Sequence, residues 1–237
     1  MALTPPPRDR PVHWVGSCKS DLLALPPEVV SDIGYALGLA SLGGKHPDAK
    51  PWKGEGPGVF EIVERFEGDA YRGVYTVRFE GVVYVLHVFQ KKSPSGVRTA
   101  RTDVGLVHDA SNAPASTMRA TTGRPRARQA SMANDITEGG GNVFADLGLS
   151  DPADRQTKTR LAMAVNALIK ERRLKQTDAA VVLGVPQSKV SALANYRLDL
   201  FSVEKLMSFL NALEHDVEIV IRPSREAVGH TSVHALT

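Results

Sequence analysis

The sequence predicts two domains of different fold class. The first is an α+β domain with helices packed on a small antiparallel sheet, and the second is an all-α helix-turn-helix domain with a short terminal strand. A helical stripe and three strand-like runs fill residues 1–96, residues 97–131 show no period of 2 or 3.6, and helical stripes dominate residues 132–223. We expect residues 97–131 to form a flexible basic linker and residues 224–237 a disordered tail.

Composition limits the classes of function. The 237 residues are 42% hydrophobic, which is enough for two cores. The single cysteine, Cys18, excludes a disulfide framework and a cysteine-rich zinc site, so we expect a buried thiol in a reducing compartment. The longest apolar run, Val82–Leu86, is far shorter than the ~20 residues that span a bilayer. These features predict a cytoplasmic protein without a membrane partner.

The N-terminal elements are predicted from local signals. Pro26-Pro27-Glu28 opens a helix, whose apolar stripe ends at Gly43-Gly44. Strands are predicted over residues 59–66, 71–79 and 82–90. The turn-forming pairs Gly68-Asp69 and Glu80-Gly81 connect these strands, which predicts an antiparallel meander.

Basic residues gather where the second and third strands meet. In a meander Arg72, near the start of the second strand, lies beside the end of the third strand, which runs into Lys91 and Lys92. Arg and Lys side chains stabilise the charge that grows on phosphoryl oxygens when an RNA 2'-hydroxyl attacks the adjacent phosphate, and Phe89 can stack an exposed base. This chemistry needs no metal or cofactor, and none is predicted. The alternative is a solvated strand edge, with His87 as a core histidine.

The segment Gln176–Ser191 reads as a helix, a Gly-Val turn and a second helix. Small or branched residues occupy the positions where two crossed helices touch: Ala180, Gly184 and Val190. Residues 158–205 hold nine basic and four acidic residues, a local charge of +5 that suits a phosphate backbone. The pattern predicts DNA binding, and an ordinary helical bundle is the alternative.

The second motif helix, which begins at Gln187, is predicted to enter the major groove. Its candidates for contacts with base edges are Gln187, Ser188 and Lys189, with Ser191 and Asn195 assisting. Phosphate contacts are expected from Gln176, Arg197 and Lys175, which position the domain without specifying sequence. The predicted partner is double-stranded operator DNA.

The first half resembles a known toxin family over Trp14 to Gly96. The matching segments are WVGSCKSDLLALPPEVVSDIGYALGLASLGGKHPDAKPWKG, YRGVYTV and VYVLHVFQKKSPSG, which look like the phage-derived HigB branch of the RelE-like toxins. The resemblance implies a RelE-like fold and a metal-independent endoribonuclease that cuts messenger RNA at the ribosome. The residues that it implicates are Arg72, Lys91 and Lys92, with Lys53 as a weaker candidate. The family's closing helix after K-K-S breaks here near Gly105.

The second half resembles the HigA-type antitoxins of the Xre (Cro/C1-like) family over Met132 to Pro223. LGVPQSKVS, LDLFSVEKLMSFLNAL and DVEIVIRP match the family order. The resemblance implies a homodimer that binds its own operator and neutralises the toxin by contact. We expect the strand Val217–Arg222 to pair across a two-fold axis, onto a toxin sheet edge or within its own domain. Asn142–Leu149 is predicted to be an arm that packs on a partner or neighbour.

Two functions are compatible with this fusion of toxin and antitoxin. In the first, the protein is a DNA-binding transcriptional autorepressor whose C-terminal half also neutralises the linked toxin half. In the second, the toxin half is an active ribonuclease that the tethered antitoxin keeps silent, because a tether of about 35 residues gives a millimolar-scale effective concentration. The sequence is consistent with both.

Overall fold

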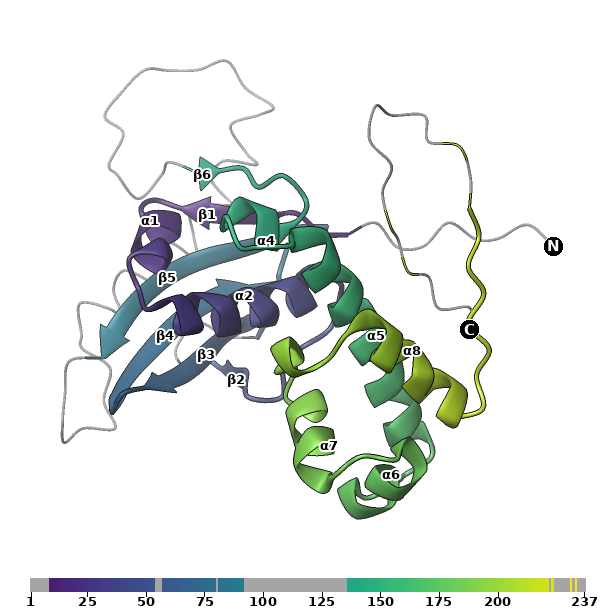
Figure 1. Ribbon diagram of the computed structural model, residues 1–237. Coiled ribbons are helices and arrows are strands. Elements are labelled where there is room, and N and C mark those ends of the chain that lie inside the picture. The colour runs from purple at the N-terminus through teal and green to yellow at the C-terminus, as the bar shows by residue number, and fades with distance from the viewer. Residues whose placement is uncertain are drawn as a thin grey trace, which may run out of the picture. The chain divides into compact units, whose positions relative to one another are not determined.

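The computed structural model describes residues 9–53, 57–79, 81–91 and 136–221, together with Pro223, Thr231 and Val233. Their contacts define two compact units, one that ends at Leu147 and one that begins at Gly148 (Figure 1). The predicted linker and the broken closing helix lie outside the described residues, as does most of the predicted tail. The division at Leu147 lies within the C-terminal domain as predicted from the sequence, which begins at residue 132.

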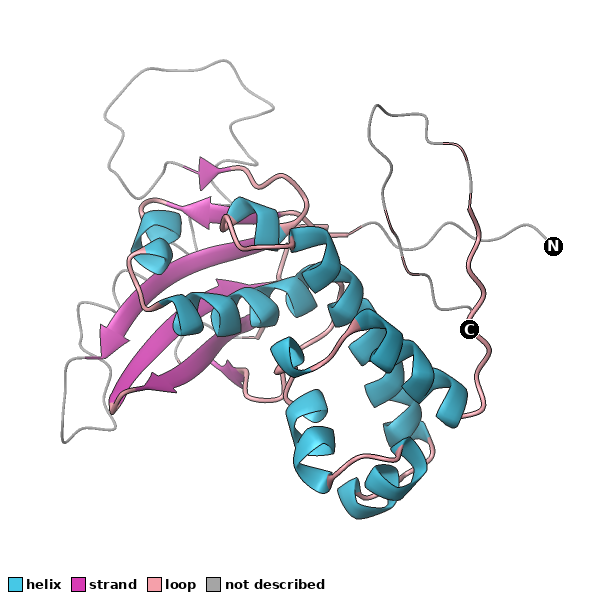
Figure 2. Cartoon of the chain, viewed as in Figure 1, coloured by secondary structure: helices cyan, strands magenta, loops and turns pink. Residues whose placement is uncertain are grey.

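The described part of the N-terminal unit is a six-stranded sheet with helices (Figure 2). In chain order the elements are β1 (Val12–Val15), α1 (Cys18–Leu23), α2 (Pro27–Ser41), β2 (Lys50–Pro51), β3 (Val59–Phe66), β4 (Asp69–Thr76), β5 (Val83–Lys91), β6 (Ile136–Thr137) and α4 (Val143–Asp146). The strand order is β2-β3-β4-β5-β1-β6, and β1 is parallel to β5 while the other neighbours are antiparallel. The predicted α+β class and the meander β3-β4-β5 are confirmed.

A two-residue turn sets the register of β3 against β4. Glu67 and Gly68 have φ angles of 51° and 87°, and Phe66 pairs with Asp69. Positive φ at both central residues is typical of a type I′ turn, whose twist matches that of the flanking strands. The turn therefore begins one residue earlier than the predicted pair Gly68-Asp69.

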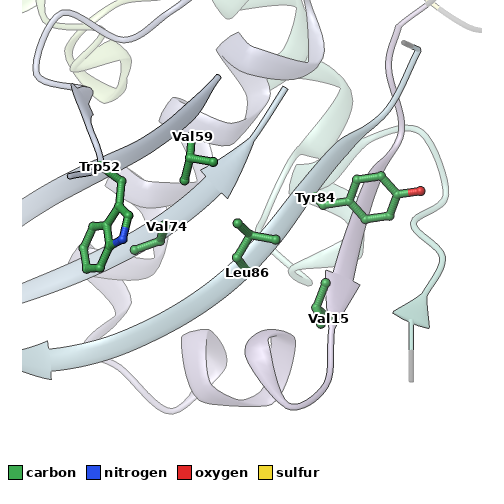
Figure 3. Packing of buried hydrophobic residues seen from close by; sticks show 6 residues of the cluster. All are labelled: Val15, Trp52, Val59, Val74, Tyr84 and Leu86. Carbon is green, nitrogen blue, oxygen red and sulfur yellow. The ribbon is translucent and has the colours of Figure 1, made fainter. Parts of the chain in front are cut away.

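The core occupies both faces of the sheet. Helix α2 begins at Pro27, a residue that suits the first helical position because it lacks an N–H. Its buried Ile33 lies 3.3 Å from the position that a Cβ at Gly73 of β4 would take, so α2 covers the face to which Gly73 belongs. Val74 belongs to the opposite face, because successive strand residues alternate. The cluster on that face comprises Val15, Trp52, Val59, Val74, Tyr84 and Leu86 (Figure 3).

The C-terminal unit is helical, as predicted. Its elements are α5 (Pro152–Glu171), α6 (Gln176–Leu183), α7 (Gln187–Ala194), the 3-10 helix η2 (Leu198–Leu200) and α8 (Val203–Ala212). Helix α5 packs on α8, and α6 packs on α7. Arg172 donates to the carbonyl of Leu213 at 2.5 Å, which ties the ends of α5 and α8 together. Within the described ranges no helix is both long and apolar enough to cross a bilayer.

The end of the C-terminal unit differs from the prediction. Residues 217–221 belong to no strand, and Arg222 lies outside the described residues. The side chains of Ile219, Val220 and Ile221 are 73%, 62% and 92% exposed. A strand needs a hydrogen-bonding neighbour, and the described residues of this chain place no strand beside this segment. The short strand in this half of the sequence is instead β6, which belongs to the N-terminal sheet.

Candidate nucleic-acid sites

Strand register brings basic residues of the N-terminal unit onto one face of the sheet. Directly opposite residues in neighbouring antiparallel strands lie on the same side. Arg72 lies between Val63 on β3 and Phe89 on β5, and Lys91 lies in the next row, opposite Ala70. The structure thus brings Arg72 and Lys91 together, as the meander predicted, on the face away from α2.

Two further charged residues on this face, Arg65 and Glu61, were missed by the sequence analysis. Arg65 shares the row of Lys91, because both lie opposite Ala70, one on each side of β4. Glu61 accepts a hydrogen bond from Arg72, with 2.5 Å between Nη1 and Oε2. The alternation of side chains along β3 could have placed Glu61 and Arg65 on one face of the sheet. Only the observed register shows which β4 residues these two side chains lie beside.

The ion pair between Arg72 and Glu61 sets the local charge. Both side chains are largely shielded from water, at 14% and 18% exposure. A carboxylate this close offsets the guanidinium charge while it fixes the orientation of the group. Glu61 therefore offsets much of the positive charge that Arg72 brings to this face, which also carries Arg65 and Lys91.

Aromatic rings lie on the same face. The rings of His87 and Phe89 stack with their centroids 4.8 Å apart and an interplanar angle of 23°. The register of β5 shifts directly beside this pair, at Val74 and Tyr75 of β4, and such bulges re-aim side chains. His87 is half-buried rather than a core histidine. The stacked pair offers a flat surface suited to an unpaired RNA base.

The structure does not place Lys53 beside Arg72. Lys53 is exposed and follows Trp52, whose N–H donates to the carbonyl of Val59 at 3.0 Å. Val59 lies four residues before the partner of Arg72 in β3, about 13 Å along the strand. Lys53 therefore lies toward the other end of the sheet. Lys92 lies outside the described residues.

In the C-terminal unit α6 and α7 form the predicted helix-turn-helix. Gly184 ends α6 in the left-handed conformation, with φ 62° and ψ 39°, which residues with a Cβ adopt only with strain. Val190 and Leu193 of α7 are 2% and 0% exposed, so this face packs inside the unit. Ala179 is the fully buried small residue of α6, whereas Ala180 is half-buried. The predicted turn at Gly184 and the buried position of Val190 are confirmed.

The start of α7 presents polar residues to solvent. Gln187 and Ser188, in its first turn, are exposed. Lys175 and Pro186 occupy the N-cap positions of α6 and α7, and neither supplies a side-chain cap. Uncapped N–H groups at a helix start favour an external acceptor such as a phosphate oxygen. The first turn of α7 therefore has the chemistry that a DNA contact requires.

Lys189 is engaged within the domain. Its Nζ donates to the carbonyl of Leu200 at 3.0 Å and lies 5.2 Å from the centre of the Phe201 ring. The ammonium group thus links α7 to the segment before α8, and it must leave these partners before it reaches a base edge. A base contact by Lys189 would therefore include the loss of a cation–π contact and a hydrogen bond.

The other predicted contact residues lie at the ends of the motif. Gln176 and Arg197 are exposed, as contacts with phosphate require. Ser191 and Asn195 are half-buried, and Nδ2 of Asn195 donates to the carbonyl of Ser191 at 3.0 Å. This bond supports the last turn of α7, so Asn195 has a structural role in addition to the predicted one.

Comparisons with known proteins agree with a two-part chain. Residues 143–222 match the family model of a helix-turn-helix domain, and residues 20–109 match that of phage derived protein Gp49-like. A solved structure described as an XRE family transcriptional regulator is 56% identical, with 36% of this chain and 99% of that chain covered and a TM-score of 0.35. No curated protein matches the chain significantly.

The fold and the exposed start of α7 define a DNA-binding helix-turn-helix protein with a second, toxin-like domain at its N-terminus. Its C-terminal part is a helix-turn-helix domain, and this part is similar in sequence to an XRE family transcriptional regulator. Its N-terminal half is a Gp49-like phage toxin domain. The predicted fusion of a RelE/HigB-like domain with an Xre-type domain is therefore confirmed.

Proposed function

We propose that the protein is a fused toxin–antitoxin module of the cytoplasm whose C-terminal half represses its own promoter and holds the N-terminal half in check. The observation that carries this proposal is the exposed polar start of α7, at Gln187 and Ser188, on a helix-turn-helix domain that shares a chain with a Gp49-like domain. A DNA-binding domain that is fused to a toxin-like domain can limit the amount of that domain by repressing the gene that encodes both.

In this proposal α7 lies in the major groove of the operator. Gln187 forms a bidentate contact with adenine, and Ser188 contacts an adjacent base edge. Gln176 and Arg197 bind phosphates on either side and set the register. Lys189 orients α7 through Leu200 and Phe201, and Ser191 and Asn195 support the contact from the rest of the helix.

The protein acts as a homodimer in this proposal, because helix-turn-helix proteins read half-sites about one helical turn apart. The exposed segment Val217–Ile221 supports a dimer through the C-terminal domain. Val217, Ile219 and Ile221 alternate in sequence, and an exposed apolar segment with this pattern can pair as a strand with another strand. The same segment from a second copy is the simplest partner, since a two-fold axis pairs it with itself.

A gel shift with DNA from upstream of the gene tests the autorepressor. Changing Gln187 and Ser188 together to Ala is expected to weaken operator binding by about 10-fold or more, because the bidentate contact of Gln187 alone is worth about 1–3 kcal/mol. Ser208→Ala, which removes an exposed hydroxyl from α8, is the matched control. Undiminished binding by the double variant would remove α7 as the recognition helix.

The basic face of the N-terminal sheet supports a second candidate function, cleavage of messenger RNA at the ribosome. The 2'-hydroxyl oxygen loses its proton to solvent and attacks the adjacent phosphorus, the bond to the 5'-oxygen breaks, and that oxygen takes up a proton from solvent, so that a 2',3'-cyclic phosphate and a 5'-hydroxyl result. Arg72, Lys91 and Arg65 stabilise the phosphoryl charge while the base stacks on His87 and Phe89. The mechanism involves no metal.

The ribonuclease is best tested with residues 1–147, which keep β6 and α4 of the N-terminal unit but lack the helix-turn-helix that we propose holds this unit in check. We expect ribosome-dependent cleavage of messenger RNA, measured by primer extension, that is lost when Arg72 and Lys91 are both changed to Ala. Lys53→Ala should reduce cleavage less, since Lys53 lies toward the other end of the sheet. Equal cleavage by the double variant and the unsubstituted fragment would exclude this face as the active site.

A further inference from the structure

Residues 136–147, which we call the clasp, belong to both halves of the protein. The match to the helix-turn-helix family begins at Val143 and therefore includes α4. By their contacts, however, β6 and α4 belong to the N-terminal unit, which ends at Leu147 (Figure 1). The clasp thus leads into the C-terminal half of the sequence and completes the N-terminal half of the fold.

The clasp adds a strand to the edge of the sheet at β1. β6 pairs antiparallel with the end of β1. Beyond β6, the N–H of Gly139 donates to Nδ1 of His13 at 3.1 Å. Gly139 comes so close to β1 that a Cβ at this position would lie 2.1 Å from the carbonyl oxygen of Val12. The approach to the sheet edge therefore requires glycine at this position.

Helix α4 closes over α2. Asn142 accepts a hydrogen bond from the N–H of Phe144 at 3.0 Å and so caps the helix. Phe144 is 1% exposed, and its ring meets that of Tyr35 edge-on with the centroids 5.2 Å apart. The ring also lies over Gly38, where a Cβ would be 2.8 Å from its Cζ. A gap at a glycine beside a tyrosine ring fits one aromatic side chain of the clasp.

The clasp and the basic residues use different surfaces of the N-terminal unit. Helix α4 packs on α2, which covers the face of Gly73, whereas Arg72 belongs to the other face. Strand β6 is separated from β4 by β1 and β5. The clasp therefore does not cover the row of residues that contains Arg72, because that row lies on the opposite face of the sheet.

We propose that the β1 edge and the Tyr35–Gly38 surface of α2 form a docking site that binds the clasp as a separable peptide. The C-terminal half then stays attached to the N-terminal half even when the covalent connection between them is cut. The proposal rests on the proposed function, in which the C-terminal half holds the N-terminal half in check, and it identifies the surface through which the two halves stay attached. The occupant is an extended edge strand, a glycine that approaches the Val12 carbonyl, and an aromatic residue on a capped turn.

A full-length protein with a site-specific protease sequence inserted after Ala110 tests this docking. After cleavage the two halves are expected to co-elute in size-exclusion chromatography at micromolar concentration. Gly139→Ala is expected to separate the cleaved halves, because the added Cβ collides with a backbone oxygen. Gly140→Ala is the matched control and keeps them together, because its Cβ meets only the side chain of Asp146, at 3.1 Å.

A second variant, together with a check of the fold, distinguishes loss of docking from misfolding. Phe144→Ala is expected to weaken association of the cleaved halves about 100-fold. Circular dichroism of each uncleaved variant checks the fold, and a gel shift on each cleaved sample separates loss of docking from loss of DNA binding. Separation of the unsubstituted halves, or equal co-elution of the Gly139→Ala and Gly140→Ala halves, would overturn the proposal.

Discussion

Arg72 donates a hydrogen bond to Glu61 across β3 and β4, with 2.5 Å between Nη1 and Oε2, on the face that also carries Arg65 and Lys91. The pair places a carboxylate beside the guanidinium that a phosphate would approach. An anion that binds Arg72 therefore competes with Glu61, and the strength of that competition can be measured.

Substitution Glu61→Gln is expected to strengthen the binding of RNA to the full-length chain. Loss of one negative charge steepens the slope of log K against log salt by about 0.7 for a single-stranded ligand. Fluorescence anisotropy with a short RNA over a salt series measures this slope. Glu64→Gln is the matched control, because Glu64 lies opposite Tyr71 on the other face of the sheet. Identical slopes for the two variants would contradict RNA binding at the Arg72 face.

Arg197 and Gln187 are expected to contribute to DNA binding in different ways. Arg197→Gln should weaken binding to all duplexes alike and reduce the salt slope by about 0.9, because one phosphate contact is lost. Gln187→Ala should cost about 1–3 kcal/mol with the operator and little with a scrambled duplex. Anisotropy titrations with both duplexes separate these effects. An operator preference that survives Gln187→Ala would exclude Gln187 from base readout.

Gly184→Ala is expected to destabilise the C-terminal unit by about 1 kcal/mol or more, because alanine is strained at a φ of 62°. Urea unfolding followed by circular dichroism measures the loss. Both tryptophans of the chain, Trp14 and Trp52, lie in the N-terminal unit, so tryptophan fluorescence supplies an internal control. A shift of the fluorescence transition as large as that of the dichroism transition would argue against a local effect.

The thiol of Cys18 is expected to be unreactive in the folded protein. Burial, aided by the charge of Asp21, raises the pKa of Cys18 to about 12, and the thiolate is the reactive form. Ellman's reagent at pH 8 should therefore label the protein in urea but not in buffer. Because the folded state retains this proton above the ordinary pKa of 9.0, its contribution to stability is constant below about pH 9 and falls as the pH rises toward 12.

Ile219→Asp is expected to convert the proposed dimer to a monomer, since a charge on the paired face of Val217–Ile221 must be buried without a partner. Sedimentation equilibrium measures the change. Glu218→Gln, on the alternate side of the same segment, should leave the dimer intact. If Ile219→Asp sediments as the unsubstituted protein does, the dimer interface lies elsewhere.

The helices were predictable because their signals are local. Pro27 marks the start of α2, and Gly184 separates two motif helices whose bounds follow the sequence pattern. Strands β1 and β6 were not predicted, because four- and two-residue strands show too little alternation and their partners are remote in sequence. Their pairing depends on tertiary contacts that no short window contains.

The candidate RNA site was predictable only in part, because its composition depends on register. A turn at Gly68-Asp69 would place Arg65 opposite Arg72, whereas the observed turn at Glu67 and Gly68 places Val63 there. This one-residue difference moves Arg65 into the row of Lys91 and brings Glu61 within reach of Arg72. Partners of this kind can be identified only once the register of the strands in the sheet is known.

The ribosome makes β6 and α4 after the whole toxin-like sequence, so the N-terminal unit lacks its edge strand until residue 137 has been synthesised and lacks α4 until residue 146 has been synthesised. Until then Tyr35, which is 2% exposed in the finished fold, lacks the ring of Phe144 that covers it. A nascent chain that terminates early gives an incomplete N-terminal domain. A chain that completes this domain already contains α4, the first helix of the segment that matches the helix-turn-helix family. The order of translation therefore links completion of the N-terminal domain to synthesis of the C-terminal half.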